Sequence, residues 1–283
     1  MRQLQDIARE QHDMATISQL TAAFESLASM HLAQIKTQVL QAQAFFNELW
    51  QIYQQLRIDN LFRFGRAQED RAITKELFLI ITAEGGFSGD IDQRLVSSML
   101  KEYDPSRNDI IVVGSHGVVL LSQLGVSHKK YFKLPNRDQN INVEPLIREV
   151  RQYKSAVAFY QTYVSLMVQD VKRIDIGKAV QAEGRHVVKS ADVISEATYI
   201  FEPTAYDVVA HIERSMLQIT MAQIIFDSKL AQYASRFRAM TSANERVSGT
   251  LGDLNLLYSR TRRETRDERL KEIMNGLNKV TTQ

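Results

Sequence analysis

The segment with the clearest capacity for ligand chemistry is a glycine-rich turn at residues 82–89, Thr-Ala-Glu-Gly-Gly-Phe-Ser-Gly. It follows a short apolar run and precedes a helical pattern, which is where an α/β sheet can hold a phosphate group. The turn lacks the lysine of a P-loop, and its spacing is not G-x-G-x-x-G. A tight structural turn is therefore the favoured interpretation, with nucleotide binding as the alternative.

A second turn, residues 114–117, places Ser115 beside His116. Sequence neighbours rarely form a nucleophile and its base, and a triad needs a third group to orient them. A polar turn between a strand and a helix is the favoured interpretation. The histidines show no metal-ligand spacing, and we interpret His31 as a polar layer in a coiled coil. The sequence therefore predicts no catalytic residue, no metal site and no cofactor.

The composition limits the class of protein. The net charge of +2 does not favour nucleic-acid binding, and without cysteine the chain has neither disulfides nor thiolate zinc ligands. No window approaches the roughly 18 apolar residues of a membrane span, and the first residues lack the apolar core of a secretory signal. We expect a soluble cytoplasmic protein that reaches the inner face of a membrane only through partner subunits.

The elements that must position any site fall into three regions, predicted as residues 1–60, 73–202 and 204–283. The four prolines, at 105, 135, 145 and 203, leave both ends of the chain free of proline, which would break a helix. In the first region we predict a helix over about residues 3–57. Its apolar residues recur at alternating steps of three and four, in one run of four from Ile17 to Leu27 and another from Val39 to Leu56. Ile35 offsets the two runs, which suggests a change of register.

The last region carries the longer pattern. From Val209 to Tyr258 the same alternation continues without a break, and only Gln223 and Asn244 are polar within it. A sustained 3.5-residue repeat predicts a left-handed supercoil with a long partner helix. The first helix is the obvious partner. The predicted seam comprises Phe24, Leu27, Phe226, Leu230, Tyr233, Phe237, Met240, Val247, Leu251 and Leu254.

The middle region joins the two helices, so an antiparallel pair is the simplest topology. A helix over 204–277 would span roughly 110 Å and the first helix roughly 80 Å, so the last should project beyond its partner. The projecting part is rich in arginine with acidic residues interleaved, which favours a solvated or protein-contacting face over a nucleic-acid site. Its candidate contact residues are Arg260, Arg262, Arg263 and Arg266.

The middle region alternates short apolar runs with helical patterns. Residues 77–81 and 109–113 are predicted strands, as are segments near 164–171 and 197–201, and helices are predicted over 90–103, 115–124 and about 143–163. This alternation predicts a largely parallel α/β sheet. The expected fold class is a Rossmann-like α/β domain between the two helices of a long antiparallel coiled coil.

Several motifs resemble one known family. Residues 226–243, containing Ala234-Ser235-Arg236-Phe237-Arg238-Ala239-Met240, are similar to E-x-x-A-R-M-x-A-M-x-x-A, and residues 254–262 resemble L-x-L-x-Y-N-[KR]-x-R. Residues 81–89 resemble I-T-S-D-[RK]-G-L-C-G, and 20–24 fit I-T-x-A-M. All belong to the gamma chain of F-type ATPases and lie in that family's order. The chain departs from the family at Arg263, where glutamine is usual, which indicates a divergent member.

The resemblance implies a non-catalytic rotor shaft inside a hexamer of alternating alpha and beta subunits. Its other implied partners are an epsilon-type subunit and a membrane ring of c subunits. The shaft would couple ATP synthesis or hydrolysis to ion translocation or mechanical work, with catalysis on beta. Two alternatives remain: a coiled-coil scaffold unrelated to rotation, and a nucleotide-binding enzyme that uses the α/β region.

Overall fold

The computed structural model describes residues 4–56, 73–134, 141–184, 202 and 204–281. Two long helices, α1 (Leu4–Leu56) and α6 (Ala205–Thr281), precede and follow the central sheet along the chain. Both begin and end within a few residues of the predicted bounds. The expected fold class is confirmed. The predicted strand at 197–201 falls outside the described residues.

The chain forms two compact units, residues 28–236 and residues 1–27 with 237–283. The boundary falls inside both helices, whereas the sequence divided the chain where the helices end. We call residues 28–56 and 205–236 the domain-side segment of the helix pair. Residues 4–27 and 237–258 are the tail-side segment. Each segment is described within its own unit.

The larger unit contains a five-stranded sheet in the order β3-β2-β1-β4-β5. β1, β2, β3 and β4 pair in parallel, and β5 pairs antiparallel with β4. The strands are β1 (Ile73–Ile81), β2 (Asn108–Val113), β3 (Lys130–Phe132), β4 (Tyr153–Tyr163) and β5 (Gln169–Asp175). The prediction of a largely parallel sheet is confirmed.

The predicted helix over about 143–163 is wrong in its second half. Helix α4 (Glu144–Val150) ends early, and the chain then enters the long strand β4. β-Branched and aromatic residues dominate the run Val157-Ala158-Phe159-Tyr160, and such residues favour a strand buried on both faces. The strand expected at 164–171 starts later, because residues 164–168 form the turn between β4 and β5.

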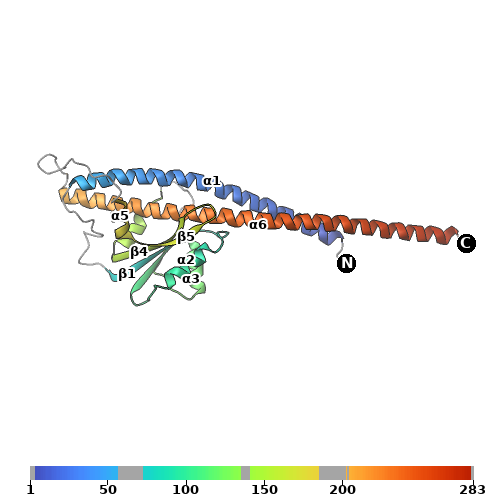
Figure 1. The fold of residues 1–283 in the computed structure, drawn as a ribbon. Coiled ribbons are helices and arrows are strands. Elements are labelled where there is room, and N and C mark those ends of the chain that lie inside the picture. The colour runs from blue at the N-terminus through green and yellow to red at the C-terminus, as the bar shows by residue number, and fades with distance from the viewer. Residues whose placement is uncertain (1–3, 57–72, 135–140, 185–201, 203, 282–283) are drawn as a thin grey trace. The chain divides into compact units, whose positions relative to one another are not determined.

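Side chains alternate between the two faces of the sheet and build two apolar clusters. Phe78 and Ile80 face α2 (Ile91–Leu100) and α3 (Ser115–Gln123). Leu77 and Leu79 face the opposite cluster, which includes α4, α5 (Ile176–Gly184) and the domain-side segment. Within this unit α6 lies between α1 and the sheet (Figure 1).

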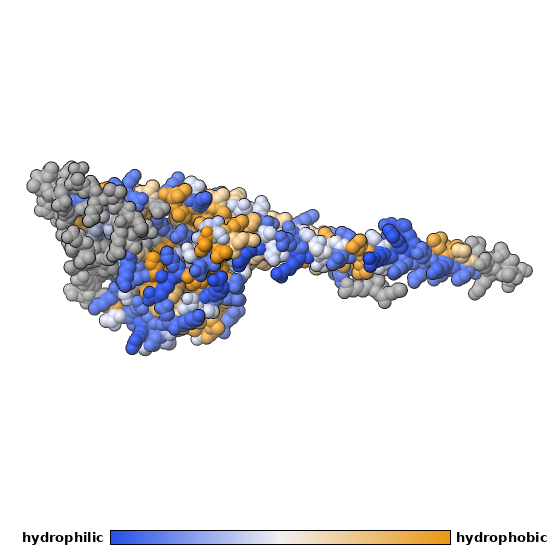
Figure 2. Space-filling model, in the orientation of Figure 1, coloured by the Kyte–Doolittle hydropathy of each residue, from blue (hydrophilic) through white to orange (hydrophobic). Residues whose placement is uncertain are grey.

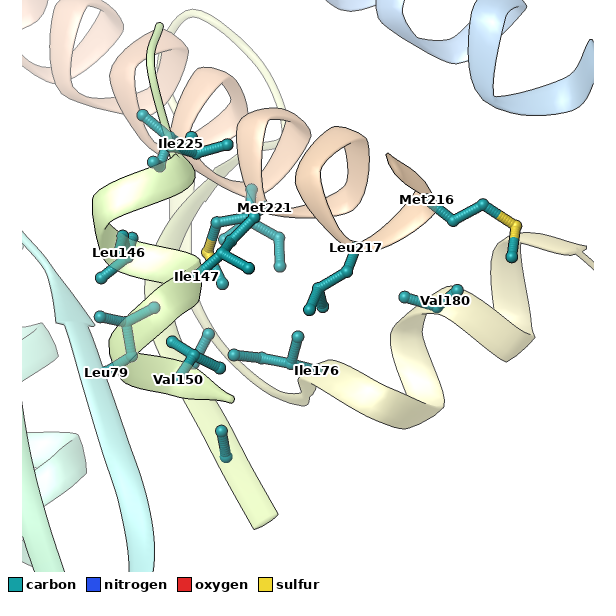
Figure 3. Packing of buried hydrophobic residues seen from close by; sticks show 14 of the residues in the cluster. Leu79, Leu146, Ile147, Val150, Ile176, Val180, Met216, Leu217, Met221 and Ile225 are labelled. Carbon is teal, nitrogen blue, oxygen red and sulfur yellow. The ribbon is translucent and has the colours of Figure 1, made fainter. Parts of the chain in front are cut away.

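Figure 3 shows how α6 is seated on the sheet unit: Leu217, Met221 and Ile225 point toward side chains of α4 and α5. These residues are buried, and most of α6 between Val209 and Ser235 is shielded from solvent. A helix that is buried nearly all round is part of a core rather than a surface element. The domain-side part of α6 is therefore fixed to the sheet unit by apolar packing.

Candidate functional site

The site begins with Thr82, the first residue after β1. Its hydroxyl donates to the carbonyl oxygens of Val113 and Gly114, each at 3.1 Å, and accepts from the backbone N–H of Gly117 at 2.9 Å. A Cβ on Gly114 would lie 2.0 Å from the Thr82 carbonyl oxygen. The glycines of the second turn are thus needed for close packing, which agrees with the structural interpretation of that turn.

A buried carboxylate lies behind this turn. Asp92, at the start of α2, has a fully buried side chain, and its Oδ2 lies 2.6 Å from His116 Nδ1. The same oxygen accepts from the backbone N–H of Ala83 at 3.3 Å. Its other oxygen accepts from Gln161 Nε2 of β4 at 2.5 Å. Asp92 therefore connects three elements at the carboxyl edge of the sheet.

The network extends from Gln161 to α6. Ser228 Oγ donates to Gln161 Oε1 at 2.5 Å, and Gln232 Nε2 lies 3.4 Å from the same oxygen and 3.0 Å from Ser228 Oγ. All three of these residues are buried. Because buried polar groups need partners, this chain of hydrogen bonds fixes both the register and the rotation of α6 on the sheet.

The glycine-rich turn is also held by α6. Ser235 Oγ donates to the Ser88 carbonyl oxygen at 2.7 Å, and Arg236 Nη2 reaches the Gly85 carbonyl oxygen and Ser88 Oγ, each at 3.5 Å. In open α/β sheets a ligand binds outside the carboxyl ends of the strands, where the strand order reverses, here between β1 and β4. In this chain the side chains of α6 occupy that place. Among the described residues no group of metal-ligating side chains occurs.

The network has one ionisable group with an altered affinity for protons. The hydrogen bond to Asp92 raises the pKa of His116, burial of the ring opposes the change, and the charge of Asp92 adds to the increase. Burial alone would favour the neutral ring, whereas the contact with Asp92 favours the protonated ring. The Asp92 side chain stabilises the imidazolium form.

In the domain-side segment, the predicted seam residues of α6 lie against α1 or within the core. Phe226 is buried, and Leu230 is half-buried. The ring of Tyr233 stacks on His31, with ring centroids 4.8 Å apart and an interplanar angle of 7°. His31 thus lies in a polar layer between the two helices.

In the tail-side segment, α6 presents a single stripe toward α1. Met240 and Leu254 are buried, and Phe237, Val247 and Leu251 are half-buried. The partners on α1 are mostly polar. Ser18 Oγ and Thr21 Oγ1 donate to Asn244 Oδ1 at 3.0 and 3.3 Å, Thr241 Oγ1 donates to Glu25 Oε1 at 2.8 Å, and Gln11 Nε2 donates to Asn255 Oδ1 at 2.7 Å.

Phe24 and Leu27 do not occupy the seam. Their exposed fractions are 38% and 48%, and the seam positions beside them are Glu25 and Ala28. Each apolar residue of the run from Ile17 to Leu27 precedes a seam position by one residue, which is about 100° around the helix. The seam of α1 also passes through Ile35 without a change of register, because steps of three and four connect it to the second run.

The four candidate arginines are exposed on α6 beyond Tyr258. This tail is mainly hydrophilic on the face seen in Figure 2, with small apolar areas near its end. Sequence reasoning missed the network at the sheet edge. Its only signal was the placement of small polar residues, such as Ser228 and Ser235, in an otherwise apolar helix.

Comparison of the sequence with known proteins shows which family the chain belongs to. A family model described as ATP synthase matches residues 3–280. The ATP synthase gamma chain of Mycoplasmoides gallisepticum is 21% identical, over 98% of this chain and 99% of its own length. That of Leuconostoc citreum is 22% identical, over 98% and 99%. The chain belongs to the ATP synthase gamma family.

Solved structures share the fold of this gamma-family chain. A chain in the Euglena gracilis mitochondrial ATP synthase, in a structure of OSCP, F1 and c-ring, covers 96% of this chain with a TM-score of 0.64 and 13% identity; 94% of that chain is covered. A chain in the central stalk and c-ring of the Tetrahymena thermophila mitochondrial ATP synthase covers 79%, with a TM-score of 0.57 and 15% identity; 99% of that chain is covered.

Proposed function

We propose that this chain rotates inside a hexamer of alternating alpha and beta subunits and couples ATP synthesis or hydrolysis to ion translocation or mechanical work. It has no active site of its own, and catalysis belongs to beta. The observation that carries the proposal is the continuity of α6. One helix of 77 residues runs from the sheet unit into an exposed tail. Membership of the ATP synthase gamma family supports the hexamer as the partner that surrounds it.

The mechanical role follows from symmetry. A single asymmetric shaft inside a three-fold collar gives each catalytic site a different set of contacts. Each site is then biased toward a different conformation, because a contact shifts an equilibrium by its differential affinity for the two states. Turning the shaft exchanges the three states among the sites. Torque passes along α6 because its domain-side part is held by the sheet core and by α1.

The tail suits a surface that must turn. Arg260, Arg262 and Arg263 are exposed and are followed by Glu264 and Asp267, so the charges are interleaved. Exposed charge pairs contribute only about 0–1 kcal/mol, and deep anchoring at a few positions would resist rotation. We propose that the arginines contact acidic or polar loops of the catalytic subunits.

The membrane is reached through partners. No helix among the described residues is long and apolar enough to cross a bilayer. We assign the contact with the membrane ring of c subunits to the sheet unit, together with an epsilon-type subunit. This would place the chain at the cytoplasmic face of the membrane as a peripheral component.

Native mass spectrometry of the protein from its own cells, purified under mild conditions, tests this function. We expect one copy with three copies each of two larger nucleotide-binding chains. A stable monomer or homodimer without such partners would contradict the proposal and favour a coiled-coil scaffold. Binding of ATP by the isolated chain would support the enzyme interpretation instead.

A further inference from the structure

The hydrogen-bond network at the sheet edge is more than a set of satisfied polar groups, because it connects the sheet to the shaft. We propose that Asp92, His116 and Gln161 form a proton-sensitive latch that holds α6 against the sheet. Gln161 contacts both sides: its amide nitrogen donates to Asp92, and its amide oxygen accepts from Ser228 of α6. The orientation of this one amide thus depends on the carboxylate behind it.

The latch works only when the Gln161 amide has one of its two orientations. The Ser228 hydroxyl can donate only if an oxygen faces it, and the carboxylate accepts only from the NH₂ group. A rotated Gln161 amide would place its oxygen against Asp92 and its nitrogen against Ser228. The charge of Asp92 therefore selects the amide orientation that binds α6.

His116 determines how strongly Asp92 is held. Its Nδ1 lies 2.6 Å from Oδ2, and the ring is partly exposed, so solvent protons reach it. A protonated ring donates a charge-assisted hydrogen bond, which is about twice as strong as a neutral one. Loss of the proton leaves the buried carboxylate with neutral donors alone: the Ala83 N–H, the Gln161 amide and, in one tautomer, the Nδ1–H of the neutral ring.

Other charged side chains come from the segments that pack around the latch. Glu84 accepts from the Leu134 N–H and the Tyr131 hydroxyl, and Arg94 of α2 pairs with Asp170 at 3.7 Å. On α6, Lys229 is buried beside Ser228 in the sequence, and Arg236 reaches the glycine-rich turn. Asp92 is the group whose charge acts on the pKa of His116.

The direction of the pH effect follows from the raised pKa of His116. Stability from the ion pair is fully present below the ordinary value of 6.5 and is lost as the pH rises through the higher pKa of the folded state. The latch is therefore tighter in acid and looser in alkali. Its consequence for torque rests on the proposed function, whereas the latch itself is a property of the isolated chain.

Hydrogen exchange of the full-length chain tests the latch. Peptides covering 225–236 are followed at about pH 6 and about pH 8, with correction for intrinsic exchange, because local opening is read from protection. The wild type should lose protection at the higher pH. His116→Gln should be less protected at the lower pH and show no pH dependence. The matched control His211→Gln, at an exposed position of α6, should behave like the wild type.

A second variant separates the latch from its proton sensor. Gln161→Leu removes the bridge and leaves Asp92 and Ser228 without that partner, so protection of 225–236 should fall roughly tenfold or more at both pH values. Wild-type pH dependence retained in His116→Gln, or full protection in Gln161→Leu, would overturn the proposal. Because these measurements use the chain alone, their failure is distinct from failure to find the hexameric complex.

Discussion

The two segments of the helix pair are built from the same two helices but on different principles. The domain-side segment buries large apolar residues, including Phe46, Trp50 and Met216, and α6 is shielded nearly all round. The tail-side segment joins its helices through polar pairs such as Thr21–Asn244, and its α1 exposes an apolar stripe. The first is stabilised by apolar packing within the chain itself. The second is a pair joined mainly by polar contacts, with an apolar stripe exposed on α1.

This difference bears on the proposed function, in which one chain is anchored in the sheet unit and turns inside a collar. Apolar burial stabilises by about 25 cal/mol per Å², while a typical hydrogen bond contributes about 0.5–1.5 kcal/mol net. The domain-side segment should therefore be much the stiffer of the two as an isolated chain. In the proposed complex, the hexamer supplies the support that the tail-side segment lacks.

The largest expected effect is a loss of stability in the domain-side segment. Phe46 is fully buried and stacks with Trp50, with ring centroids 6.0 Å apart. Phe46→Ala should lower the free energy of unfolding by about 3–5 kcal/mol, because it opens a cavity in the core. Urea denaturation followed by circular dichroism measures the change. Phe45 on the same helix is 55% exposed, so Phe45→Ala should change stability by less than about 0.5 kcal/mol. Equal effects would contradict the burial assignment.

The next effect concerns the exposed stripe. Leu20→Ser with Leu27→Ser should leave the stability of the isolated chain within about 0.5 kcal/mol, because both side chains are exposed. The same double variant should weaken binding to the hexamer by roughly 2 kcal/mol, or about 30-fold, because the proposed complex would cover these side chains. A titration of the chain against the hexamer measures this. The control Ala22→Ser with Ala23→Ser alters exposed neighbours and should bind normally. If the double variant destabilised the chain but bound the hexamer normally, these side chains would have to pack in the seam between the two helices instead.

Much of this comparison follows from the sequence, but not all of it. The seam of α6 from Val209 to Tyr258 is visible because its apolar repeat is long, and the strands near Leu79 and Ile111 are visible as apolar runs. The seam of α1 before Ala28 is hidden. There the more apolar stripe is the exposed one, and polar residues face α6 because Thr241 and Asn244 offer them hydrogen bonds.

The network at the sheet edge could not have been predicted in the same way. Asp92, His116, Gln161 and Ser228 come from four elements and show no common spacing. Only the fold brings them together, and the direction of an amide depends on groups that are distant in the sequence. The sequence predicts the position of the glycine-rich turn after β1. It does not show that side chains of α6 contact the turn.

A smaller effect tests the polar seam. Asn244→Ala removes the acceptor of Ser18 and Thr21, and should cost about 1 kcal/mol of local stability in the tail-side segment. Thr21 also donates to backbone carbonyls of its own helix, which limits the loss. Hydrogen exchange of peptides covering 14–25 reports it. Glu245→Ala at the adjacent exposed position is the control. A loss of several kcal/mol would mean that the polar pairs hold this segment as firmly as a core.

The smallest expected effect is at the tail. Reversing Arg260, Arg262 and Arg263 to glutamate should reduce ATPase coupling by a few-fold, since exposed ion pairs contribute about 0–1 kcal/mol each. The reduction should be greatest at low ionic strength, because salt screens such contacts. Rates of ATP hydrolysis and of rotation, measured together over a salt series, provide the readout. Unchanged coupling at every salt concentration would remove the arginines from the interface.

The central claim is that the chain turns as one shaft, and a single-molecule rotation assay tests it most directly. The hexamer is fixed to a surface, and a bead is attached to the sheet unit of this chain. The account predicts rotation in one direction on addition of ATP, with pauses every third of a turn. Steady ATP hydrolysis with the chain bound but the bead stationary would contradict it.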